Sequence, residues 1–484
     1  MATVSGTTDI SSYVAQLIDL ERQSGPEKVY KQDQQALTQR SATLTDLRSN
    51  LSALNTQVQA LTQPGTLSPF AAKSVASSNS SLATATASAG AVNGTYSLFV
   101  SQLAKRSTVV STQWSQSASE VASAVGAGTH TFRITVNGVD TDLSVAVGAT
   151  DSNKTVLAAM AAAVNASDAK VTASVVNDSG STARLVLTSD ETGSANAITL
   201  SDQGGTLIAA TGTASGTQSS GTAGGFLYAP DQLDARFVLN GLAISRGSNT
   251  IKDVLSGVTM SLTGTQTADA TALTLTVGPD TDAIRSKVQA FLDAYNTTIA
   301  FLKERTGVTV STDTSSTSTT DVTSVTRGAL ASESTYLGLL MHLRADVGGR
   351  ISTGGAGGPV ALSEIGITAG TDGKLTIGDT TKFNNALAEN PDGIATLFNS
   401  SDGIASRASV RLNGFIMAGG TLDNAVTATS SQLSSITRAI AQQETYLKVR
   451  QATLLDQYTS LQQTLLDLQS QQTLLDSVNS ALTG

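Results

Sequence analysis

Apolar residues recur every seven positions at both ends of the chain, which predicts helices that pair through a narrow apolar seam. Near the N-terminus two rows have the spacing of the a and d positions of a coiled coil: Leu37, Leu44, Leu51 and Val58 in one row, Leu47, Leu54 and Leu61 in the other. Near the C-terminus one row runs without a break: Leu433, Ile440, Leu447, Leu454, Leu461, Leu468, Leu475 and Leu482. Its companion row is mostly polar, so we expect this helix to be marginal without a partner.

Two arrangements of these ends are compatible with the repeat. They can pair with each other as an intramolecular helical hairpin, or they can order only when docked in a larger assembly. At the N-terminal end, Ser24 and Glu27 have the spacing of a capping box around Pro26, and Pro64-Gly65 is expected to stop the helix.

Between the ends the apolar period changes to two, which predicts strands. The alternating segments are 96–100, 132–136 and 143–147, with further strands expected at 184–187, at 197–200 and within 237–277. Asn137-Gly138 and Asn240-Gly241 are typical hairpin turns. One helix is expected at 153–165, and the Gly/Ser/Thr-rich stretch 204–225 reads as a domain connector.

After Gly278-Pro279 the helical period returns. Phe291, Leu292, Tyr295 and Ile299 belong to one apolar helix face and are expected in the core of a helical domain. A polar break is expected at 311–320, followed by a helix at 330–347, a loop at 348–358 and short helices at 383–387 and 394–398. The chain is thus expected to be nested, with helical ends and a β-rich middle.

Composition argues against most chemistry. The 484 residues contain no cysteine and two histidines, and charged residues make up 14%. These counts exclude disulfides, thiolate metal sites and cysteine nucleophiles, and we expect no catalytic, cofactor-binding or metal-binding site. A net charge of −9 without a basic block disfavours nucleic acid and anionic membranes as partners. His130, His342 and Trp114 are interpreted as structural residues.

Five blocks, read in order, resemble the family of bacterial flagellar filament capping proteins, also called hook-associated protein type 2. The blocks are Gly94 to Ala104 (GTYSLFVSQLA), Asn240-Gly241 with Ser248 to Val254 and Gly257 to Thr259, Phe291 to Asn296 (FLDAYN), Leu362 to Thr368 with Asp372 to Leu375, and the heptad tail. Residues 131–200 also resemble a small β-rich module shared by flagellins and hook-associated proteins. The tail departs from the family pattern at Tyr458 to Gln462.

The resemblance implies an α+β multidomain fold with coiled-coil-like helical termini, a helical leg domain and two nested β-rich head domains. The implied boundaries are 1–68 with 428–484 for the terminal coiled coil, 69–93 with 279–427 for the leg, 94–112 with 226–278 for one head domain and 113–225 for the other.

The resemblance also implies a non-enzymatic role. Such a protein forms an annular homo-oligomer at the distal tip of the flagellum, retains exported flagellin and promotes its folding and polymerisation. Implied partners are other copies of the chain, flagellin, hook–filament junction proteins and a cytosolic export chaperone. The implied route is the flagellar type III apparatus, without a cleaved signal peptide or membrane insertion. The alternatives are another flagellar axial or junction protein and a surface adhesin, and an adhesive role can coexist with capping.

Overall fold

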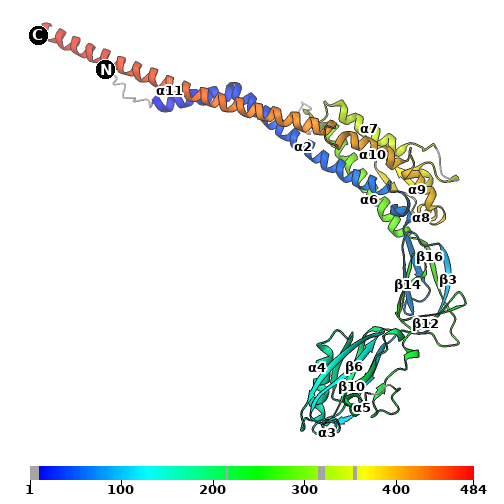
Figure 1. Ribbon diagram of the computed structural model, residues 1–484. Coiled ribbons are helices and arrows are strands. Elements are labelled where there is room, and N and C mark those ends of the chain that lie inside the picture. Colours follow the sequence, from blue (N-terminus) through cyan, green and yellow to red (C-terminus); the bar gives the residue numbers. More distant parts are fainter. Residues whose placement is uncertain (1–9, 214–215, 314–321, 353–356, 484) are drawn as a thin grey trace. The chain divides into compact units, whose positions relative to one another are not determined.

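The structure is a computed structural model that describes residues 10–213, 216–313, 322–352 and 357–483 (Figure 1). The side chains of residues 10, 311–313, 322–324, 482 and 483 lie outside this description. The chain divides into two compact units, one formed by residues 1–64 with 282–484 and the other by residues 65–281. An α+β multidomain fold is confirmed, and each unit is described by itself below.

The first unit is mainly helical. Its helices are α1 (Ile10–Ser24), α2 (Pro26–Leu61), α6 (Thr281–Thr306), α7 (Ser334–Gly348), α8 (Thr380–Glu389), α9 (Pro391–Asn399), α10 (Ile404–Ile416) and α11 (Thr421–Thr483). Two antiparallel hairpins interrupt them, β17 (Val308–Asp313) with β18 (Val322–Arg327), and β19 (Ile367–Ala369) with β20 (Leu375–Ile377).

Helices α2 and α11 run side by side and antiparallel (Figure 1). Arg48 near the end of α2 pairs with Asp423 at the start of α11, whereas Gln34 nearer the start of α2 donates to Thr437 further along α11. The second half of α2 also packs against α10. Its apolar rows are therefore fully buried, with exposed fractions of 0–1% at Leu44, Leu47, Leu51, Leu54, Val58 and Leu61.

The core of the bundle is centred on α6. Phe291, Leu292, Tyr295 and Ile299 are at most 1% exposed, and the ring of Phe291 meets that of Phe398 edge-on with centroids 6.0 Å apart. Burial raises the pKa of the Tyr295 hydroxyl. The side chains expected in the core from the helical period are therefore in it.

The second unit consists of two β-rich modules. One holds a sheet in the order β1-β16-β3-β12-β13 and a sheet in the order β14-β15-β2. Its strands are β1 (Lys73–Ser77), β2 (Ala83–Ala87), β3 (Gly94–Gln102), β12 (Ala235–Leu239), β13 (Leu242–Arg246), β14 (Thr250–Leu255), β15 (Val258–Leu262) and β16 (Leu273–Pro279). The core between them includes Leu98, Val100, Phe237, Met260 and Leu275.

The other module holds a sheet in the order β10-β6-β7 and a sheet in the order β11-β4-β9-β5, with β8 also paired to β9. Its elements are β4 (Arg106–Val110), β5 (Trp114–Ser115), α3 (Glu120–Val125), β6 (Gly128–Val136), β7 (Val139–Val147), α4 (Asn153–Asn165), β8 (Val171–Val176), β9 (Thr182–Thr192), β10 (Thr199–Gly204), α5 (Leu207–Thr211) and β11 (Gly225–Phe226). The helix expected at 153–165 is confirmed, with its N-cap Ser152 accepting from Thr155 N.

Two expectations about local structure are wrong. Ser24 does not open a capping box; its hydroxyl donates to Leu20 O inside α1, and Gly25 is the N-cap of α2. A side chain at position 25 would place its Cβ 2.5 Å from Glu21 O, so the tight junction between the two helices requires glycine there.

The stretch 204–225 is not a simple connector either. Leu207 and Ile208 of α5 are at most 5% exposed and belong to the core of the second β module. Asp202 holds this helix by accepting from Ile208 N and Ala209 N at 2.8 and 3.1 Å. Residues 214 and 215 lie outside the described part.

The polar break expected at 311–320 begins as a strand, because β17 extends to Asp313 and pairs with β18. Alternation of polar and β-branched residues, rather than low complexity, describes this stretch. Residues 314–320 lie outside the described part.

We predict that Phe291→Ala lowers the free energy of unfolding of the helical unit by about 3–5 kcal/mol, since it removes a buried ring and leaves a cavity. Val410→Ala on α10 is the control, because Val410 is 77% exposed and its truncation should change stability by about 0.5 kcal/mol at most. Urea unfolding followed by helical circular dichroism measures both. Equal effects of the two substitutions would contradict this account of the core.

Candidate functional site: the terminal coil

Helices α1 and α2 lie one after the other along α11, and both run antiparallel to it. Arg450 on α11 pairs with Glu21 near the end of α1 at 3.1 Å. Further along α11, the ring of Tyr458 meets that of Tyr13 edge-on, with centroids 5.8 Å apart. We call the assembly of α1, α11 and the first half of α2 the terminal coil.

A small apolar cluster holds α1 in the terminal coil. Val14, Ile18 and Leu447 are at most 4% exposed and pack together, with Leu454, Leu455 and Tyr458 partly buried against them. The cluster has few side chains, so α1 is held by far less buried surface than the second half of α2.

The junction of α1 and α2 contains a buried acid. Glu27 is 1% exposed, and its carboxylate lies 2.6 Å from Lys31 Nζ and 3.3 Å from Arg22 Nε. Hydrogen bonding from Lys31, with smaller contributions from Arg22, holds the pKa of Glu27 below its ordinary value. Its charged form therefore ties the end of α1 to the start of α2.

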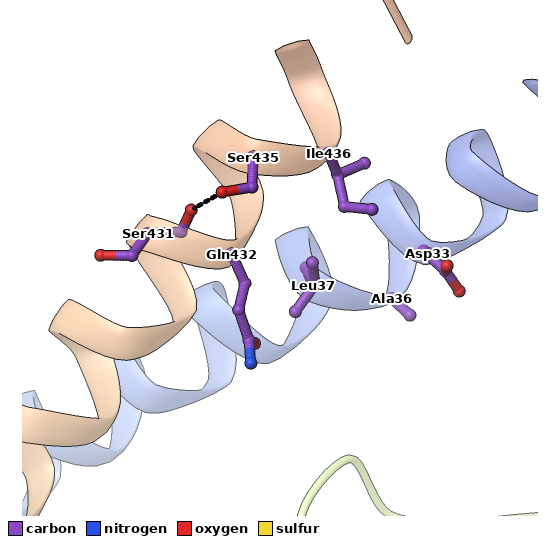
Figure 2. Close-up of a pocket in the computed structure, with 7 residues that line it drawn as sticks. All are labelled: Asp33, Ala36, Leu37, Ser431, Gln432, Ser435 and Ile436. Atoms are coloured by element: carbon purple, nitrogen blue, oxygen red, sulfur yellow. Dashed lines mark hydrogen bonds between the residues drawn. The ribbon is translucent and has the colours of Figure 1, made fainter. Parts of the chain in front are cut away.

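Small side chains leave a groove between α2 and α11 (Figure 2). The groove has a volume of about 550 Å³ and is lined by Asp33, Ala36, Leu37, Ser431, Gln432, Ser435 and Ile436. Leu37 and Ile436 are the larger apolar members, and both are only partly buried. The seam between the helices is thus loosely packed here, although it is tight from Leu44 onward.

The C-terminal row of the seam changes character along α11. Leu433, Ile440 and Leu454 are half-buried and Leu447 is 1% exposed, whereas Leu461, Leu468 and Leu475 are 54%, 54% and 68% exposed. The side chain of Leu482 lies outside the described part. The predicted seam residues are therefore brought against a partner helix only as far as Leu454.

Beyond Ser460 the exposed apolar surface of α11 is broader than one heptad row. Leu465, Leu466, Leu474 and Val478 are also 50–67% exposed. We call the residues Leu461, Leu465, Leu466, Leu468, Leu474, Leu475 and Val478 the distal apolar surface. The sequence carries a signal for this breadth in the adjacent pairs Leu465-Leu466 and Leu474-Leu475, which a single row does not include.

The residues weighed for chemistry have structural contacts. His130 Nε2 lies 2.9 Å from Gly126 O, and Trp114 Nε1 donates to Thr211 O at 3.2 Å. Trp114 also packs against the core of the second β module. Among the described residues there is no group of three or more His, Cys, Asp or Glu side chains that could hold a metal ion. A search of the same residues finds no helix with the length and apolarity to cross a membrane.

Two asparagines join blocks that are distant in the sequence. Asn249 accepts from Ala104 N at 2.7 Å and donates to Ala104 O at 2.9 Å. Asn296 in the same way accepts from Leu375 N at 2.7 Å and donates to Leu375 O at 2.8 Å. In each pair, one asparagine amide satisfies both backbone groups of a residue in another block.

Comparisons with known proteins explain why these blocks occur together. The family models "Flagellar hook-associated protein 2 N-terminus" and "Flagellar hook-associated protein 2 C-terminus" match residues 6–107 and 233–470, which together cover well over half of the chain. The chain belongs to the flagellar hook-associated protein 2 family. It is accordingly a structural protein of the flagellar cap and not an enzyme.

Named relatives support the same assignment. The chain is 28% identical to the B-type flagellar hook-associated protein 2 of Pseudomonas aeruginosa over 89% of this chain and 87% of the relative. It is 26% identical to the A-type protein of that species over 94% of this chain and 92% of the relative. The flagellar cap protein FliD of Escherichia coli, solved as its D1-D2-D3 domains, matches with a TM-score of 0.56 and 25% identity over 80% of this chain and 99% of that one. Another type of flagellar axial protein is not favoured.

We predict that Asn296→Ala destabilises the helical unit by about 1–3 kcal/mol, because both backbone groups of Leu375 lose their partner. Thr297→Ala is the matched control, since Thr297 is exposed on the same helix and bonds only within it. Urea unfolding by helical circular dichroism measures the difference. A control that is as destabilising as Asn296→Ala would contradict the role given to the amide.

We predict that Glu27 makes the terminal coil sensitive to acid. Because the pKa of Glu27 is lowered in the folded chain, its contribution is present above its ordinary pKa of 4.5 and is lost as the pH falls through the folded value. Glu27→Gln should therefore melt earlier than the native chain at pH 7, with the gap narrowing at pH 3. Glu444→Gln, at an exposed position of α11, serves as the control and should leave the gap at zero at both values.

Proposed function

We propose that this chain works at the distal tip of the flagellum as a ring of identical copies that retains exported flagellin while it folds and joins the filament. The coarse role as a flagellar cap protein follows from its family. The ring, the retention of flagellin and the part that each domain takes are our proposal. One observation carries it furthest, namely the distal apolar surface on α11.

The distal apolar surface is suited to docking. Its side chains lie on a helix that α1 and α2 hold over the preceding turns, so the surface is presented on an ordered element. Exposed apolar patches of this kind are costly in water and mark interaction sites. A helix of this pattern gains stability when a partner helix covers it. We propose that the partners are helical ends of proteins at the hook–filament junction or at the end of the filament.

The terminal coil is also built to release. The companion row on α11 includes Gln443, Arg450 and Gln457, and the groove at Leu37 and Ile436 leaves the seam underfilled. Polar positions in a seam lower its stability. A cap must let go and re-form its contacts as each flagellin is added beneath it, and a weak seam allows that exchange.

The remaining parts of the proposal concern organisation. We propose the four nested domains expected from the sequence, with residues 69–93 and 279–427 as the leg and residues 94–112 with 226–278 and 113–225 as the two head domains. We further propose export by the flagellar type III apparatus, with a cytosolic chaperone that covers the exposed end of α11 before assembly. The absence of cysteine supports export and assembly without disulfide formation.

Two leucines of one heptad row separate docking from folding. We predict that Leu468→Asp leaves the melting of the purified chain nearly unchanged, because Leu468 is 54% exposed, but stops filament growth in a strain whose own cap gene is deleted. Leu454→Asp should instead destabilise the terminal coil in the purified chain, because Leu454 packs against the α1 cluster. Filament length by negative-stain microscopy and swimming on soft agar are the measurements.

The matched control is Gln469→Asp, which adds the same charge to the next residue of the exposed helix. It should support filaments of normal length. Normal filaments with Leu468→Asp, or equal loss with Gln469→Asp, would show that the distal apolar surface does not dock the cap.

A further inference from the structure

The hairpin β17–β18 has two chemically different faces. In its register Val310 lies opposite Val325, Thr309 opposite Thr326 and Val308 opposite Arg327. Neighbouring side chains on a strand point to opposite faces of a sheet. One face therefore carries Val308, Val310 and Val325, which we call the valine face, and the other carries Thr309 and Thr326.

The hairpin turns its polar face toward its own chain. Thr309 and Thr326 line a groove of about 580 Å³ together with Gln39, Ala42 and Asp46 of α2. The three valines do not line this groove, and they are 54%, 59% and 53% exposed. This is the reverse of the usual arrangement, in which a sheet buries its apolar face and leaves the polar one in water.

An isolated two-stranded hairpin is at best marginally stable in water, and it gains stability when its apolar face is covered. Other positions on α7 and α10 leave single apolar residues in water, which is ordinary. Three valines together on one face of an otherwise uncovered hairpin are not. The valine face is therefore an interaction surface that the folded chain leaves open.

A second open apolar surface lies on the helix that follows. The inner side of α7 buries Tyr336, Leu339, Leu340 and Leu343, whereas Leu337 and Met341 on its outer side are 50% and 60% exposed. Between them stands Gly338, where an added Cβ would meet nothing within 4 Å. Glycine inside a helix is destabilising, and here it leaves a shallow depression between two apolar side chains. We call Leu337, Gly338 and Met341 the α7 surface.

We propose that the valine face of one copy of this chain packs on the α7 surface of a neighbouring copy. The inference rests on the proposed self-association and names one of its contacts. Both surfaces are apolar, neither has an acidic residue among its defining members, and the depression at Gly338 gives the flat valine face room to approach. Because the two surfaces differ, the contact is heterologous, and contacts of that type close into rings.

Size favours a second copy over an unrelated partner. These few side chains bury far less than the roughly 1,200 Å² of a stable interface. A partner that bound here alone would be held weakly. Neighbouring copies in a ring touch through other surfaces as well, so a small contact between hairpin and helix adds to an interface that already exists.

The absence of cysteine makes a direct test possible, since any introduced cysteine is the only thiol of its chain. Full-length Val310→Cys and Leu337→Cys variants are mixed in equal amounts and treated with a short bismaleimide over a concentration series. We expect a cross-linked dimer that contains one chain of each variant, at least fivefold more abundant than in a mixture of Thr309→Cys with Leu337→Cys. Thr309 is equally exposed but lies on the other face of the hairpin.

The outcomes separate this inference from the function on which it rests. Light scattering of the native chain reports self-association independently. If the native chain associates but the mixed dimer does not exceed the Thr309→Cys control, or Val310→Cys links mainly to itself, the contact proposed here is wrong while the ring stands. If the native chain stays monomeric at every concentration, both the self-association and this contact are overturned.

A second measurement does not depend on cross-linking. Val310→Thr combined with Val325→Thr keeps β-branched side chains in the strands but makes the valine face polar. We expect at least a fivefold loss in the association constant by sedimentation velocity, without loss of helical signal. An unchanged association constant would overturn the contact.

Discussion

The antiparallel pairing of α2 with α11 is the contact on which the helical unit depends. It brings together segments near the two ends of the chain, and the leucine rows of α2 from Leu44 to Leu61 are buried against both α11 and α10. Every element between residues 65 and 420 is therefore enclosed by this one closure. A nested chain of this kind can carry large insertions because the pairing of its ends, and not the order of its middle, fixes the frame.

The pairing is strong at one end and weak at the other, and this gradient suits a cap. Near Arg48 and Asp423 the helices are tied by an ion pair and packed into the bundle. Along α11 the contacts reduce to the underfilled groove at Leu37 and Ile436, then to the small α1 cluster, and then to a helix whose leucines face solvent. Stability thus falls toward the part of the chain that we propose to dock, where contacts must be broken and remade.

The same economy is visible in the rest of the unit. Asn296 fixes the β19–β20 hairpin to α6 with one amide, and the β17–β18 hairpin keeps its valines outside. One hairpin is thus completed within the chain, while the other is left incomplete. The incomplete one, together with the α7 surface, is where we infer a neighbouring copy.

Periodicity alone determined much of this protein. Heptad spacing predicted α2 and α11, alternation predicted the strands of the β modules, and the helical period placed Phe291, Leu292, Tyr295 and Ile299 on one face, because side-chain direction repeats with the backbone. It did not anticipate α10, and it read Gly204 to Gly225 as a connector and Ser311 to Asp313 as a break. Such short segments gain their structure from tertiary contacts, as Leu207 does in a core made by distant strands. Only the tertiary structure decided which leucines of an unbroken row are covered. Leu447 and Leu475 are equivalent in the repeat, and they differ because α1 lies against the first and no described element covers the second.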